Sequence, residues 1–167
     1  IVFFHGIGAG RNAYMKFIAN LAQQGYLVYA FDNTGSMTSE GPSIYGFGQI
    51  IKDQKYFFDF LDHDPDGKNL PRYVVGHSWG GYAALMALTP LYKVDKCVSI
   101  SGFDRVSSTF TALTKHENNR IIRTILKIYC YIKLGADGDK SALKLLKSTK
   151  IPVLYIQGSE DKVVPVH

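Results

Sequence analysis

The sequence lacks long apolar runs and contains only two cysteines among its 167 residues. The apolar runs are far shorter than the roughly 18 residues that a membrane-spanning helix needs. Cys97 and Cys130 lack the CxxC spacing of metal or redox sites, so we expect buried thiols and a reducing, cytoplasmic compartment. An apolar share of 46% excludes a disordered chain and suits one compact domain.

The net charge of +5 belongs to one segment of the chain. Residues 115–150 hold nine lysines and arginines against three acidic residues, whereas the rest of the chain has a balance of −1. This distribution argues against nucleic-acid binding by the body of the fold. Within the basic segment, a helix over 120–134 would place Arg120, Arg123 and Lys127 on one face and apolar residues on the opposite face, which are Ile121, Ile125, Ile128, Tyr129 and Ile132. We expect the basic face to be solvated, with binding of an anionic substrate or a membrane surface as the alternative.

Short apolar segments alternate with helix-length segments along the chain. The apolar segments are rich in β-branched and aromatic residues, as strands buried on both faces are, and they span 1–4, 26–31, 72–75, 94–100 and 151–156. Helical patterns mark 13–23, 46–62 and 80–88. The alternation predicts an α/β fold, in which a parallel sheet of about five strands carries helices on both faces.

A long connection interrupts this alternation between Gly102 and Ile151. It is longer than a single crossover helix requires, and it has helical patterns at 120–134 and around 141–147. We therefore divide the chain into a core part over 1–102, a helical lid over 103–150, and a last core strand with its loop over 151–167.

The motif Gly76-His77-Ser78-Trp79-Gly80-Gly81 follows a predicted strand and opens a segment of small residues. In this context G-x-S-x-G forms a tight turn with the serine at its apex, because Gly76 and Gly80 let the strand and the helix approach closely. We expect Ser78 to be a nucleophile, and the N–H of Trp79 to receive negative charge from a substrate oxygen. The alternative is a glycine-rich helix start with an idle serine.

A second glycine-rich loop, His5-Gly6-Ile7-Gly8, directly follows the first predicted strand. A dinucleotide-binding loop is the weaker interpretation, because it requires a glycine where Arg11 stands. An oxyanion loop fits better, in which the N–H groups of Ile7 and Trp79 meet on one oxygen. We expect His5 to be a structural, hydrogen-bonded residue rather than a proton carrier.

An acidic loop, Gly158 to Pro165, follows the last predicted strand. A carboxylate at the carboxyl end of a strand can orient an imidazole and stabilise its positive charge. We predict this role for Asp161. Its neighbour Glu160 and Asp104, after the preceding strand, are alternatives, and ordinary surface acids are the plain interpretation of all three.

Together these motifs resemble the α/β-hydrolase superfamily, and within it the monoacylglycerol-lipase-like esterases and the serine aminopeptidase-like enzymes. The resemblance identifies His5-Gly6 with the oxyanion loop, the turn at Ser78 with the nucleophile elbow, the segment after Gly158 with the acid loop, and 103–150 with the lid. At Asp32 to Gly41 the family's arginine and histidine are replaced, although an aspartate, two glycines and a serine remain. The resemblance implies catalysis without a metal or cofactor.

The family's catalytic histidine follows the aspartate in the chain, and here only His167 does so. A further crossover and strand would need a dozen or more residues, so His167 comes too early. His77 lies within the turn beside the serine, and His63 and His116 are expected to be solvated. We therefore expect a fragment that lacks the first strands and a histidine-bearing C-terminal segment, and that is weakly active or inert by itself.

The predicted activity is cleavage of a carboxylic ester, or of an amide, through an acyl-enzyme on Ser78, with Asp161 supporting the histidine. The expected substrate is a small molecule with an apolar acyl group. Rival predictions are an acyltransferase or a serine aminopeptidase on the same fold, and a catalytically inactive binding module.

Overall fold

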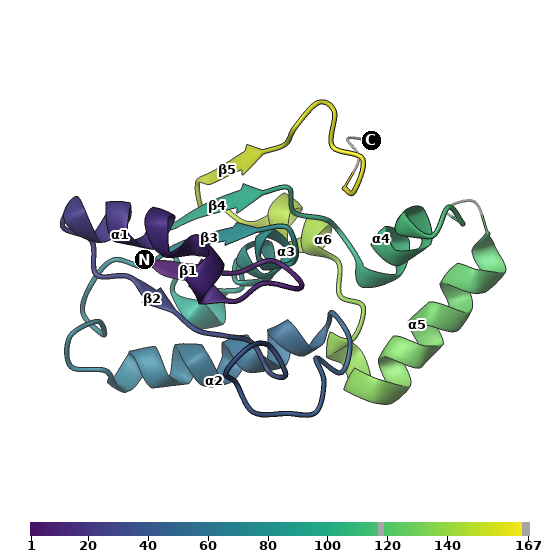
Figure 1. Ribbon diagram of the computed structural model, residues 1–167, viewed down its shortest axis with the longest axis horizontal. Coiled ribbons are helices and arrows are strands. Elements are labelled where there is room, and N and C mark those ends of the chain that lie inside the picture. The colour runs from purple at the N-terminus through teal and green to yellow at the C-terminus, as the bar shows by residue number, and fades with distance from the viewer. Residues whose placement is uncertain (117–118, 165–167) are drawn as a thin grey trace.

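The computed structural model describes residues 1–116 and 119–164, and within them the chain forms a five-stranded sheet (Figure 1). The strand order is β2-β1-β3-β4-β5, and every pairing is parallel. The strands are β1 (Val2–Phe4), β2 (Tyr29–Ala30), β3 (Tyr73–His77), β4 (Lys96–Ile100) and β5 (Val153–Ile156). The predicted fold class is confirmed.

Helices cover both faces of this sheet. They are α1 (Met15–Gln23), α2 (Gln49–His63), α3 (Trp79–Met86), α4 (Val106–Leu113), α5 (Arg120–Leu134) and α6 (Ala142–Ser148), with 3₁₀ turns at Arg11–Tyr14, Pro90–Tyr92 and Gly135–Asp137. On one face, the ring of Phe3 lies 4.9 Å from that of Tyr14 and 5.5 Å from that of Phe17. On the other face, α3 contacts β1, β3 and β4, and α2 and α6 pack against α3.

The apolar runs of the strands follow from this layered arrangement. Successive side chains of a strand point to opposite faces, and here both faces are covered. Val2 and Phe4 lie in the core cluster with α2 and α3, while Phe3 points to α1 and is 1% exposed. Every residue of α3 is buried, which explains why the helix carries small residues on all sides.

The strand predicted over 26–31 is much shorter in the structure, where β2 spans only Tyr29–Ala30. The N–H of Tyr26 still bonds to the carbonyl of Leu21, so the chain leaves α1 later than predicted. In addition β1, which β2 pairs with, is itself only three residues long.

Beyond β4, the chain forms two helices that extend away from the sheet. α4 and α5 pack against each other, whereas α6 packs on α3 with the core helices (Figure 1). The predicted helix over 120–134 is confirmed. On its basic face Arg120 and Lys127 are exposed, as expected, whereas Arg123 is half-buried on the side of Cys130, and the isoleucine face is exposed as well. The division into core and lid stays a prediction.

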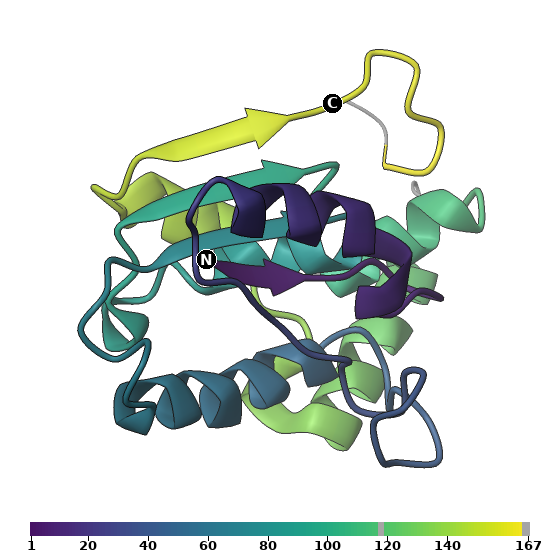
Figure 2. The ribbon, with the colours of Figure 1, turned by 60° about the vertical axis from the view of Figure 1, so that its left-hand side comes forward.

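The parallel strands bring their carboxyl ends to one edge of the sheet, toward which the arrows point in Figure 2. The turn from β3 to α3 lies at this edge and is closely packed against its neighbours. A Cβ atom at Gly76 would overlap the carbonyl oxygen of Gly80, and a Cβ at Gly80 would overlap the carbonyl oxygen of Phe4. Only glycine therefore fits at either position.

We predict that Gly76→Ala lowers the free energy of unfolding by at least about 3 kcal/mol, because the added methyl group meets backbone that has no room to move. Gly158→Ala is the matched control, since its Cβ would come no closer than 3.8 Å to another residue. Its expected effect is within about 0.5 kcal/mol. Urea denaturation of both variants measures the difference, and equal effects would contradict the close packing.

Candidate active site

Ser78 occupies the turn between β3 and α3 with a backbone that non-glycine residues rarely adopt. Its φ is 55° and its ψ is −115°. The N–H of Ser78 donates to the carbonyl of Ile100 at 2.8 Å, and its carbonyl accepts from the N–H of Tyr82 at 3.0 Å. Backbone strain of this kind persists only where surrounding contacts fix it, and it is common at functional sites.

The loop after β1 lies beside this turn. Phe4 is in register with Gly76, so His5 to Ile7 continue next to the residues that lead into Ser78. The order of the strands reverses between β1 and β3, and in open α/β sheets ligands bind in the crevice at such a point. Ile7 is 42% exposed on this loop.

His5 is held as a structural residue within that loop, and is 1% exposed. Its Nε2 accepts from the N–H of Asn33 at 3.0 Å, so its proton resides on Nδ1, which donates to the carbonyl of Gly6 at 2.8 Å. Nδ1 thus bonds within the loop after β1, and Nε2 joins this loop to Asn33, the residue after Asp32.

His77 is engaged with Tyr14 rather than with the serine that follows it. Its Nδ1 lies 2.8 Å from the hydroxyl of Tyr14, which also accepts from the N–H of Gly6 at 3.2 Å. Tyr14 therefore connects the two loops at the crevice. No sequence pattern indicates this role, because Tyr14 fits only as one apolar residue of a predicted helix.

A salt bridge anchors the segment after β2 to the same loop. The carboxylate of Asp32 accepts from the N–H of Arg11 at 2.7 Å and pairs with its guanidinium at 2.6 Å. Burial favours a raised pKa for Asp32, but the hydrogen bonds from Arg11 and Thr38 and the charge of Arg11 hold the pKa below its ordinary value. Arg11 was missed as a site residue, since its partner lies 21 positions away.

Asp161 lies in the loop after β5 as an ionised carboxylate. Its Oδ1 accepts from the N–H groups of Val163 and Val164, both at 2.9 Å, and its Oδ2 accepts from Gln157 at 3.0 Å. The hydrogen bonds from Val164 and Val163, helped by the side chains of Ser101 and Gln157, lower the pKa of Asp161.

Backbone bonds place this carboxylate at the same edge as the serine. Ser101 directly follows Ile100, whose carbonyl binds the N–H of Ser78, and the N–H of Ser101 donates to Ile156 at the end of β5. Asp161 is therefore separated from the turn at Ser78 by one strand, β4.

The two alternative acids are placed differently. Glu160 is exposed and makes no hydrogen bond within residues 1–116 and 119–164. Asp104 caps α6: its Oδ1 accepts from the hydroxyl of Ser141 at 2.6 Å and from the N–H of Leu143 at 2.8 Å. Its other oxygen lies 3.6 Å from the guanidinium of Arg105. His167 lies outside the described residues.

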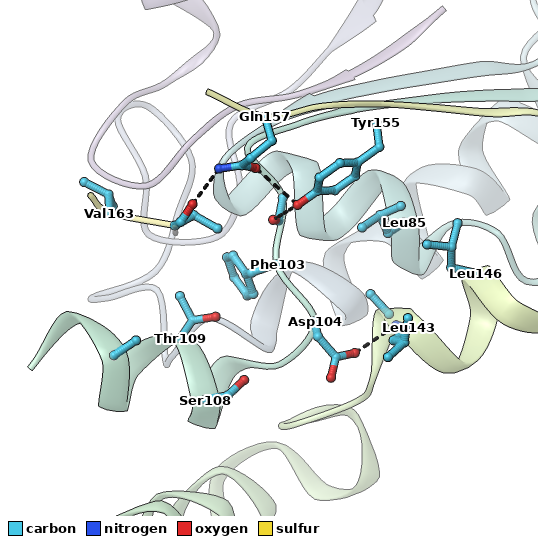
Figure 3. A pocket seen from close by; sticks show the side chains of 14 residues that line it. Leu85, Phe103, Asp104, Ser108, Thr109, Leu143, Leu146, Tyr155, Gln157 and Val163 are labelled. Carbon is cyan, nitrogen blue, oxygen red and sulfur yellow. Dashed lines mark hydrogen bonds between the residues drawn. The ribbon is translucent and has the colours of Figure 1, made fainter. Parts of the chain in front are cut away.

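A cavity of about 450 Å³ opens beside the loop of Asp161 (Figure 3). Tyr155 and Gln157 border it from the side of β5, opposite Ser108 and Thr109 of α4, and Phe103 lies between them. The remaining lining residues are mostly apolar and include Leu85, Ala112, Leu143, Leu146 and Val163. Ser78 is not among the residues that line it.

Within the described ranges, no helix is long and apolar enough to cross a bilayer, and no three metal-ligating side chains cluster together.

One wall of the cavity is held by hydrogen bonds. The hydroxyl of Tyr155 donates to the side-chain oxygen of Gln157 at 3.2 Å and to the carbonyl of Gly102 at 2.6 Å. These bonds fix the cavity wall next to Asp161.

Solved structures with the same fold are α/β-hydrolases. The Pyrococcus furiosus esterase Pf2001 is 24% identical with a TM-score of 0.74, covering 99% of this chain and 63% of that one. The monoacylglycerol lipase of Paleococcus ferrophilus is 21% identical with a TM-score of 0.62, covering 98% and 74%. Mouse alpha/beta hydrolase domain-containing protein 10 is 19% identical with a TM-score of 0.66, covering 98% and 70%.

These likenesses establish the fold, and the chain spans less than two thirds of the length of the Pyrococcus esterase. No curated protein matches the chain. A family model described as serine aminopeptidase, S33 (Hydrolase_4) matches residues 1–128, which include both glycine-rich loops. The chain therefore belongs to the serine aminopeptidase S33 family within the α/β-hydrolase superfamily.

Proposed function

We propose that the protein is a serine hydrolase that cleaves carboxylic esters through an acyl-enzyme on Ser78. The observation that carries the proposal is the backbone of Ser78, held at a φ of 55° at the reversal point of the sheet. This turn presents the hydroxyl at the carboxyl edge, where ligands bind in open α/β sheets. Attack by the hydroxyl oxygen on the ester carbonyl forms the acyl-enzyme and releases the alcohol.

The N–H groups of Ile7 and Trp79 are our proposed donors to the oxyanion. Trp79 is the first residue of α3, so its N–H has no carbonyl within the helix to bind. Ile7 comes from the loop that Tyr14 and His5 hold beside the turn. Preorganised donors of this kind contribute on the order of 3 kcal/mol each to stabilising the transition state.

The general base in this proposal is a histidine outside the described residues, oriented by Asp161. The four described histidines are engaged elsewhere. His63 and His116 bond to the carbonyls of Asp59 and Thr114. His5 bonds to Gly6 and Asn33, and His77, at the end of β3, bonds to Tyr14. The base would take the proton of the Ser78 hydroxyl and return it to the leaving alcohol. The ionised Asp161 stabilises the imidazolium in between.

The cavity favours an ester with an apolar acyl group over a peptide. An aminopeptidase has to bind the ammonium group of its substrate, which calls for an anion in the site. Asp104 is the only acid among the described residues that line the cavity, and its oxygens are occupied by Ser141, Leu143 and Arg105. Peptide hydrolysis, favoured by the family description, is the second candidate.

We also propose a cytoplasmic location. Cys97 and Cys130 are both free and buried, as predicted. Burial raises the pKa of Cys97 to about 12, so this thiol stays protonated and unreactive. Unpaired buried thiols support a reducing compartment.

Replacing the nucleophile tests the proposed activity. In the full-length protein, Ser78→Ala is expected to lower kcat for p-nitrophenyl butyrate by about four orders of magnitude or more, because no other group can form the acyl-enzyme. Ser159→Ala, at an exposed serine of the loop after β5, is the control and should leave kcat unchanged. Unchanged turnover in Ser78→Ala would rule out the nucleophile.

Filling the cavity tests where the acyl group binds. Ala112→Trp places an indole in the cavity from α4, so turnover of p-nitrophenyl decanoate is expected to fall about tenfold or more while turnover of the acetate stays within about twofold. Ala136→Trp, in a separate hollow, is the matched control and should affect neither ester. Equal losses for both chain lengths in Ala112→Trp would place the acyl group elsewhere.

A further inference from the structure

Helix α5 turns an apolar ridge away from the rest of the molecule. The ridge consists of Ile121, Ile125, Ile128 and Ile132, whose exposed fractions are 73%, 59%, 54% and 74%. Their spacing of four, three and four residues places them in one stripe along the helix. Figure 1 shows α5 at the outer end of the molecule, beyond α4.

The helix already has a packed side, so the ridge is not needed to hold α5 in place. Cys130 and Leu134 are buried on the side opposite the ridge, and α5 packs against α4. Two further aromatic side chains, Tyr129 and Tyr131, are 52% and 67% exposed beside the isoleucines. A continuous exposed apolar surface of this kind marks an interaction site.

The charges on α5 indicate what covers the ridge. The helix has four basic residues and no acidic residue, and none of the four forms an ion pair within 1–116 and 119–164. At 100° per residue, Arg120 lies about 80° from the nearest isoleucine on one side of the ridge and Lys133 about 80° from the nearest on the other, and Lys127 shares a hollow with Ile128. A second copy of this basic helix would be repelled, whereas an anionic surface would be attracted.

A hollow of about 440 Å³ lies next to the ridge. Lys127, Ile128 and Tyr131 line it from α5, and Arg105 and Asp139 line it from the other side. Arg105 donates to the carbonyl of Asp139 at 2.7 Å, and the carboxylate of Asp139 accepts from the N–H and the hydroxyl of Ser107. Arg105 and Asp139 are thus occupied by each other and by Ser107. Lys127 is the charged group in this hollow that is available to bind a phosphate next to the apolar side chains of Ile128 and Tyr131.

We propose that α5 lies in the plane of an anionic phospholipid surface, with the isoleucine ridge among the acyl chains and Arg120 and Lys127 at the headgroup phosphates. The helix has 15 residues and is about 22 Å long, which is too short to span a hydrocarbon layer of about 30 Å. A helix with one apolar face and basic flanks instead lies at the interface. This surface site is independent of the chemistry at Ser78.

Vesicle binding by the full-length protein tests the ridge. We expect co-sedimentation with phosphatidylcholine vesicles that contain phosphatidylserine, weaker binding at high salt, and little binding to phosphatidylcholine alone. The double variant Ile125→Asp, Ile128→Asp should lower the partition coefficient roughly a hundredfold. Leu91→Asp is the matched control, since Leu91 is 77% exposed in the turn that precedes β4, and it should bind as the unmodified protein does.

Charge reversal tests the basic flank. Lys127→Glu is expected to weaken binding to the phosphatidylserine vesicles about tenfold, whereas Lys55→Glu, an exposed position on α2 with the same change in net charge, should leave binding unchanged. Circular dichroism checks that each variant is folded.

A variant that keeps the ridge apolar provides an independent measurement. Ile125→Trp adds a fluorophore to a protein segment whose single tryptophan, Trp79, is 1% exposed. Its emission should shift to the blue when phosphatidylserine vesicles are added.

Three results would overturn the proposal. They are no binding to phosphatidylserine vesicles, equal binding by the aspartate variants, and a dimer that buries the ridge and that the aspartate substitutions dissociate.

Discussion

The site depends on the close approach of three backbone segments at the turn that contains Ser78. Gly80 leaves no space for a side chain against the carbonyl of Phe4, and Gly76 leaves none against Gly80. The bond from the Ser78 N–H to Ile100 then joins this turn to the next strand. A serine with a φ of 55° is costly by itself, so these contacts are what hold its backbone in this conformation at the edge of the sheet.

Around that turn, the loops are fixed by polar side chains that bond to backbone groups. Tyr14 accepts from Gly6, His5 accepts from Asn33, and Asp161 accepts from two N–H groups of its own loop. Each bond reduces the freedom of a loop at the crevice, and the bonds of His5, which is 1% exposed, also satisfy ring nitrogens that would be costly to bury unpaired. This preorganisation supports the proposed oxyanion site, because donors that are already in place need no rearrangement during the reaction.

The features that could be predicted from the sequence are those with a local cause. The turn at Ser78 follows from glycines two residues away on either side, and the strands follow from short runs that are apolar on both faces. The length of β2 depends on β1, and the cap of α6 by Asp104 joins residues 37 apart, so neither has a local pattern. Likewise, the periodicity of α5 separates an apolar face from a basic one, but it does not show which side of the helix is packed. Contacts with α4 determine the packed side, and they lie outside the helix's own sequence.

The most direct test of the central claim is to map where a serine-directed fluorophosphonate reacts in the full-length protein. A serine held at this turn beside preorganised donors should form one covalent adduct, and mass spectrometry of the peptides should locate it at Ser78. An adduct on another serine, or no adduct in protein that is folded and hydrolyses esters, would contradict the account.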